Sequence, residues 1–170
     1  MSVAIEPRIQ SSPRPPLGLA LAALGPIAIG GILAARVGAI SPLAAAPAIV
    51  FGVFAATSPA LYIAIAATGD APPLASVLRA LAAALAAAGI ALAGLVLPAA
   101  FLSLSSVGEA TTVVVCSAAL AGAAVLAMRR LATELATRTA MSTTIFYIWA
   151  FATLGIAGRL WWDLAAEVAL

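Results

Sequence analysis

A run of 25 residues without an ionisable side chain, from Ala80 to Leu104, constrains this chain more than any other feature. About 20 apolar residues in a helix already cross the ~30 Å hydrocarbon core of a bilayer. Two comparable apolar segments precede this run and two follow it. We therefore expect an all-α integral membrane protein: a bundle of five transmembrane helices joined by short loops.

The composition of the chain agrees with this expectation. Of its 170 residues, 65% are hydrophobic and 8% are charged, which is far from the usual composition of soluble domains. The length accommodates one compact membrane domain and leaves no room for a second, soluble one. All eight basic residues are Arg and Ala dominates the apolar set, so we expect a GC-rich bacterial genome and a multi-pass protein of the bacterial inner membrane.

We expect a flexible cytoplasmic tail over residues 1–16, because this segment is rich in Ser and Pro and its prolines disfavour a helix. The alternative, a cleaved secretion signal, is disfavoured by the length of the apolar run that follows. Residues 17–170 are expected to form a single transmembrane domain, with a helical extension beyond the lipid over residues 129–139. The expected spans are 17–35, 42–67, 78–104, 111–128 and 144–162.

The distribution of Arg residues predicts the orientation. With five spans, six of the eight Arg residues fall on one side of the membrane, and the positive-inside rule assigns that side to the cytoplasm. The amino terminus is therefore expected inside and the carboxyl terminus outside. The six residues are Arg8, Arg14, Arg79, Arg129, Arg130 and Arg138.

Prolines interrupt the first two spans and mark a candidate solute or helix-kink site. Pro26 lies in the first span, and Pro59 follows Thr57 and Ser58 in the second, with Tyr62 about one turn later. Proline leaves a helical carbonyl without its donor, and Ser or Thr hydroxyls bond to backbone groups nearby. One interpretation is that the two kinked helices frame a cavity. Simple kinks are favoured, because Gly, Pro, Ser and Thr are common in membrane helices.

Charged and aromatic residues near the ends of the spans are expected to anchor the protein at the membrane interface. Arg79 lies about one turn inside an apolar boundary, where its long side chain can snorkel to the headgroups. Four-residue spacing predicts that Arg130 aligns with Glu134, and that Arg159 pairs with Asp163. The expected anchors are Arg79, Arg129, Arg130, Arg138, Arg159, Trp161, Trp162 and Asp163.

Several classes of chemistry are disfavoured. The chain has no His and one Cys, so we expect no catalytic, cofactor or metal site. Cys116 cannot form an intrachain disulfide, and as a nucleophile it would lack a base. Every carboxylate maps to a loop or a span boundary, which disfavours a proton relay. The net charge of +2 is small and dispersed, which disfavours nucleic acid binding.

These features favour a non-catalytic integral membrane protein, an accessory, anchoring or scaffold subunit of a bacterial inner-membrane complex. Its expected partners are membrane lipids and either other membrane-protein subunits or a second copy of itself. The alternative is a small channel or carrier that uses the kinked first and second spans. No motif in the sequence identifies a ligand.

Overall fold

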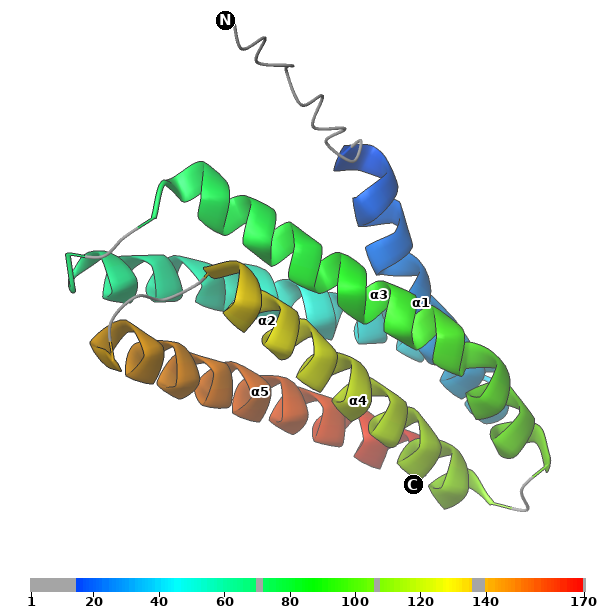
Figure 1. Ribbon diagram of the computed structural model, residues 1–170. Coiled ribbons are helices and arrows are strands. Elements are labelled where there is room, and N and C mark those ends of the chain that lie inside the picture. Colours follow the sequence, from blue (N-terminus) through cyan, green and yellow to red (C-terminus); the bar gives the residue numbers. More distant parts are fainter. Residues whose placement is uncertain (1–14, 70–71, 106–107, 136–139, 170) are drawn as a thin grey trace, which may run out of the picture.

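The computed structural model describes residues 15–69, 72–105, 108–135 and 140–169 (Figure 1). Its regular elements are all helices, and no strand occurs among the residues described. The expected all-α bundle is thus confirmed. The five helices are α1 (Pro15–Val37), α2 (Ser41–Ala66), α3 (Leu74–Ser105), α4 (Glu109–Leu135) and α5 (Ala140–Ala169).

The helices extend beyond most of the expected spans. α1 begins at Pro15, inside the expected tail, because the first turn of a helix needs no intrahelical acceptor for its N–H groups and so tolerates proline. Of the extension expected over residues 129–139, the part up to Leu135 belongs to α4. The rest of that extension, including Arg138, lies outside the described residues, as do residues 1–14 of the expected tail.

Glycine ends the first two helices. Gly38 follows α1 with a φ of 72°, and Gly69 follows α2 with a φ of 78°. This left-handed backbone conformation is common just past a helix end and carries no steric cost for glycine. The two glycines therefore let the chain turn back sharply toward the next helix.

Four of the helices are long and apolar enough to cross a membrane. They are α2, α3 and the described apolar parts of α4 and α5, Ala110–Leu135 and Met141–Glu167. The corresponding apolar part of α1 among the described residues, Ala22–Val37, is shorter than these four. The architecture is that of a multi-pass membrane protein, and the fifth crossing, by α1, stays a prediction.

α3 makes the two most extensive helix contacts in the bundle. It packs along both α1 and α4, while α1 also packs on α2 and α2 packs on α5. α4 and α5 follow one another in the chain but share much less contact than α3 and α4 do. α4 therefore packs more loosely on α5 than it does on α3. In Figure 1, α4 (yellow) and α5 (orange-red) lie farther apart toward the left of the view.

Glycines allow the closest helix contacts. A Cβ on Gly25 of α1 would lie 2.5 Å from the Leu92 Cβ and 2.8 Å from the Gly89 carbonyl oxygen, both on α3. A Cβ on Gly30 would collide with the Pro42 carbonyl at the start of α2. Small residues let helix backbones approach closely in membranes. α1 thus depends on two glycines for its contacts with α3 and α2.

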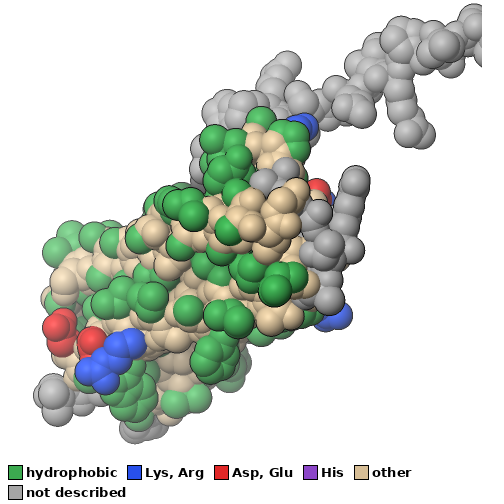
Figure 2. All heavy atoms as spheres, turned by 90° about the vertical axis from the view of Figure 1, so that its left-hand side faces the viewer, with side chains coloured by type: hydrophobic (Ala, Val, Ile, Leu, Met, Phe, Trp, Pro, Cys, Tyr) green, Lys and Arg blue, Asp and Glu red, His purple; other side chains and the backbone are tan. Residues whose placement is uncertain are grey.

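Many large apolar side chains of the described residues are exposed on the outer surface. On the face shown in Figure 2, hydrophobic side chains predominate, and charged side chains occupy a few places near its edges. Some of the largest side chains are also among the most exposed, with Leu97 at 80% and Phe151 at 82%. Such a surface suits contact with lipid and would be unfavourable in water.

Candidate functional site

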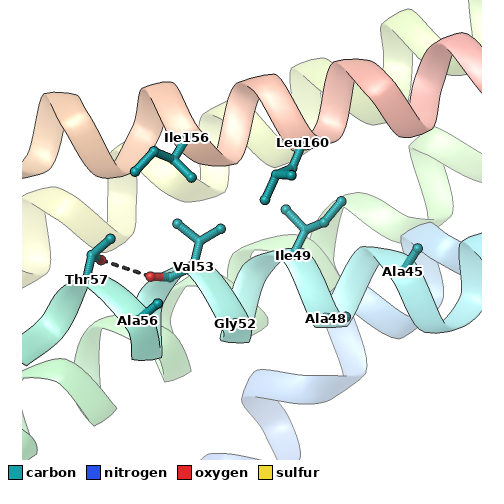
Figure 3. A pocket seen from close by; sticks show the side chains of 9 residues that line it. All are labelled: Ala45, Ala48, Ile49, Gly52, Val53, Ala56, Thr57, Ile156 and Leu160. Atoms are coloured by element: carbon teal, nitrogen blue, oxygen red, sulfur yellow. Dashed lines mark hydrogen bonds between the residues drawn. The ribbon is translucent and has the colours of Figure 1, made fainter.

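Thr57, Trp149 and Thr153 join α2 to α5 inside the bundle, and Ser58 lies beside Thr57. The Trp149 indole N–H of α5 donates to the Thr57 carbonyl of α2 at 2.8 Å. The Thr153 hydroxyl donates to the Thr57 hydroxyl at 3.2 Å, which in turn donates to the Val53 carbonyl at 2.9 Å. Ser58 donates to the Phe54 carbonyl. We call Thr57, Ser58, Trp149 and Thr153 the polar junction; Figure 3 shows the Thr57 bond.

Among the described residues, the predicted solute-site residues take part in different helix contacts. Pro26 is buried next to Gly25, which packs against α3, whereas Thr57 bonds to α5. Tyr62 is partly buried against the hydrophobic core. The hydroxyls of Thr57 and Ser58 are engaged by protein groups, as the helix-kink alternative requires, and the solute-site alternative stays a prediction.

A shallow groove of about 480 Å³ lies beside the polar junction, between α2 and α5. In Figure 3, Ile156 and Leu160 of α5 stand over the α2 face that runs from Ala45 to Thr57. The lining is apolar except for Thr57, whose hydroxyl already donates to Val53. This groove offers an apolar contact surface and no reactive group.

A second groove runs between α4 and α5, and Ala46, Ile49 and Val50 of α2 line part of it. It consists of one hollow of about 650 Å³ and another of about 330 Å³, and Val125 and Leu154 line both. Arg129 lines the first hollow, near the end of α4. In the second hollow, the Trp161 indole N–H donates to the Ser117 hydroxyl at 2.7 Å. We call this continuous hollow the α4–α5 groove.

Ser117→Ala and Trp161→Phe are each expected to lower the free energy of unfolding by about 0.6 kcal/mol, because interhelical hydrogen bonds in membranes contribute roughly that much. The double variant is expected to lose little more than either single variant. Denaturant titration of the protein in micelles, arranged as a double-mutant cycle, measures the coupling. Strictly additive losses would contradict the bond.

A second polar region lies between the ends of α1 and α3. Arg36 is half-buried and lines a hollow of about 380 Å³ together with the buried Ser103. Thr112 of α4 is 1% exposed, and its hydroxyl has no hydrogen-bond partner among the described residues. The sequence did not predict this polar region, because Arg36 was expected to lie in a short turn.

The expected interface anchors are distributed over several helix ends and form no single site. Three of them lie in ion pairs between residues four apart, Arg130 with Glu134 at 2.6 Å and Arg159 with Asp163 at 3.2 Å. The Arg79 side chain is exposed and donates to the Ala75 carbonyl and to Ser76. The exposed anchors in the described part of the chain are Arg79, Arg129, Arg130, Arg159, Trp162 and Asp163.

Trp161 makes a contact within the bundle that the sequence did not predict. It is partly buried against the core and bonds to α4, whereas the neighbouring Trp162 is 67% exposed. Sequence reasoning also missed Trp149 and Thr153. Their four-residue spacing, which places them on one helix face, was the available signal.

The described residues contain no group of three or more His, Cys, Asp or Glu side chains that could hold a metal ion. The regions that combine polar or charged side chains with helix contacts or hollows are the polar junction, the α4–α5 groove and the region around Arg36. Comparison of the chain with protein-family models, curated proteins and solved structures found no match.

Proposed function

We propose that this chain is a non-catalytic integral membrane protein of a bacterial inner membrane, where it acts as an accessory, anchoring or scaffold subunit of a larger assembly. The observation that carries the proposal is a set of outward-facing glycines that the chain's own packing leaves without a neighbour.

Two kinds of glycine occur in the helices. Adjacent helices occupy the space beside Gly25 and Gly30. A Cβ on Gly94, Gly122 or Gly155 would instead meet nothing within 4 Å. In lipid, small residues are enriched where helix backbones meet, because association depends on close van der Waals packing. The exposed glycines on α3 and α4 therefore suit contact with helices of another subunit.

Gly94 and Gly122 make the best candidate contact. Both are exposed, and their helices α3 and α4 pack side by side. Gly108 lies in the loop that joins these helices, and each glycine is fourteen residues from it in the sequence. The antiparallel arrangement of α3 and α4 therefore brings them to a similar depth in the membrane. Ala118, one turn before Gly122, is also exposed, so α4 offers a pair of small residues with the four-residue spacing common in membrane helix contacts.

The absence of His from the sequence supports the non-catalytic part of the proposal. The channel or carrier alternative gains no support from the geometry, because the Thr57 and Ser58 hydroxyls already donate to backbone carbonyls. We retain an orientation with the amino terminus inside. In support, the start of α3 with Arg79 and the end of α4 with Arg129 lie toward the same side of the bundle in Figure 1.

The test is purification of the full chain from its native membrane in mild detergent, with the mass of the particle measured. We expect a complex larger than one chain, and we expect Gly122→Leu to reduce recovery of the partner about tenfold, since a poorly fitting side chain at a helix contact costs at least ~1.4 kcal/mol. Ala55→Leu, at an exposed position on α2, is the matched control. A lone monomer, or equal recovery with both variants, would contradict the proposal.

A further inference from the structure

We propose that the α4–α5 groove binds one anionic phospholipid, with an acyl chain along the apolar hollow and the phosphate on Arg129. The site is independent of the proposed subunit role, because Gly94 and Gly122 do not line the groove.

The groove has the shape and lining that an acyl chain requires. Its walls are almost entirely apolar, and they include the small residues Ala121, Ala124 and Gly158, which leave space between the helices. A Cβ on Gly158 would meet no atom within 4 Å. An open, dry hollow of this kind in a bilayer fills with whatever apolar chain is adjacent, and lipid chains are the most abundant.

The length of the groove corresponds to one leaflet. Arg129, at one end, and Ser117, at the other, are twelve residues apart on α4, which is about 18 Å along a helix. One leaflet contributes about 15 Å, half of the ~30 Å hydrocarbon core. A lipid with its phosphate at Arg129 would therefore extend its chain to the level of the hydrogen bond between Trp161 and Ser117.

Charge favours an anionic headgroup. Arg130 is neutralised by Glu134, whereas no ion pair or hydrogen bond joins the Arg129 side chain to another residue in the described part of the chain. Arg129 thus presents an uncompensated positive charge at the mouth of an apolar groove. Guanidinium binds phosphate through paired, charge-assisted hydrogen bonds. A zwitterionic headgroup would bring its own cation close to this charge.

Tyr147 adds a second polar group at the same mouth. It lines the hollow that contains Arg129 and is 62% exposed, and its ring packs edge-on against Phe146 with 5.6 Å between centroids. Tyrosine is suited to the level of the headgroups, because its ring is apolar and its hydroxyl forms hydrogen bonds.

A second copy of the chain suits this groove less well than a lipid does. A helix laid into the groove would have to offer Arg129 a carboxylate. Glu134 is already paired with Arg130, and Asp163 with Arg159. The exposed Glu167 lies at the far end of α5 from the Arg129 hollow, so a copy in the same membrane orientation would not bring it there. Burying an unpaired guanidinium at such a contact would be costly, whereas a lipid supplies both the apolar chain and the anion.

The experiment is native mass spectrometry of the full chain released from detergent micelles, with phosphatidylglycerol and phosphatidylcholine of identical acyl chains as probes. The wild-type chain should retain phosphatidylglycerol about tenfold more than phosphatidylcholine, and Arg129→Gln should reduce retention of phosphatidylglycerol about tenfold, the effect of one strong charge-assisted contact. Gly158→Leu, which fills the groove, should reduce retention of both lipids at least about fivefold.

Matched controls separate these effects from general changes in charge and size. Arg130→Gln removes the same charge from the neighbouring residue, and Gly155→Leu adds the same side chain outside the groove; each should change retention less than about twofold. Circular dichroism verifies the fold of each variant. Equal retention of the two lipids by the wild type, equal effects of Arg129→Gln and Arg130→Gln, or a dimer that only Gly158→Leu dissociates would each overturn the proposal.

Discussion

Gly25→Leu is expected to prevent α1 from docking on α3. The new Cβ alone would lie 2.5 Å from the Leu92 Cβ and 2.8 Å from the Gly89 carbonyl oxygen. Neither atom belongs to the flexible end of a side chain, so the clash can be relieved only by separating the helices. We expect the free energy of unfolding to fall by about 3 kcal/mol or more, the upper range for overpacked cores.

The measurement is denaturant titration of the purified chain in micelles, with helix content and hydrodynamic size as the two readouts. Gly94→Leu is the control, because a Cβ there meets nothing within 4 Å and a substitution at an exposed position changes stability by less than about 0.5 kcal/mol. Similar unfolding midpoints for the two variants would show that α1 does not contact α3 at Gly25.

Trp149→Ala is expected to cause the second large loss. Trp149 is 8% exposed, and its ring lies 6.1 Å from the rings of both Phe54 and Phe146. Its indole N–H also donates to the Thr57 carbonyl. Truncating a buried Trp costs about 3–5 kcal/mol in soluble cores. We expect about 3 kcal/mol here, because lipid solvates apolar side chains in the unfolded state and the remaining cost is lost packing.

Trp149→Phe separates the two contributions. It keeps an aromatic ring against Phe54 and removes the hydrogen bond to α2, so the expected loss is about 0.6–1.7 kcal/mol. Trp162→Ala, at a side chain that is 67% exposed, should change the unfolding free energy by less than about 0.5 kcal/mol. If Trp149→Ala and Trp162→Ala had equal effects in the same micelle titration, the polar junction would not hold α2 to α5.

The helices themselves could be predicted from the sequence. Each apolar run is long enough to require a helix in lipid, because backbone N–H and C=O groups have no other partners there. Spacing within one helix was equally informative. The pairs Arg130–Glu134 and Arg159–Asp163 are both formed, because residues four apart always lie on the same helix face.

The partners of each helix could not be predicted in the same way. In this chain Gly25 packs against another helix while Gly94 packs against none, although both lie in similar Ala-rich sequence. Helices that are apolar on all sides have no polar stripe to distinguish the face toward a neighbour from the face toward lipid. Spacing alone therefore did not predict the hydrogen bond between Trp161 and Ser117.

The sequence by itself determined that this chain is a set of apolar helices with its charges toward the helix ends, because the length of an apolar run and the spacing of charges are local properties. Only the tertiary structure decided that α2 is bonded to α5 through Thr57, and that α4 and α5 diverge to leave a groove with Arg129 at its mouth. Those features depend on how closely whole helix surfaces fit one another, and close packing is the main force that assembles helices in a bilayer.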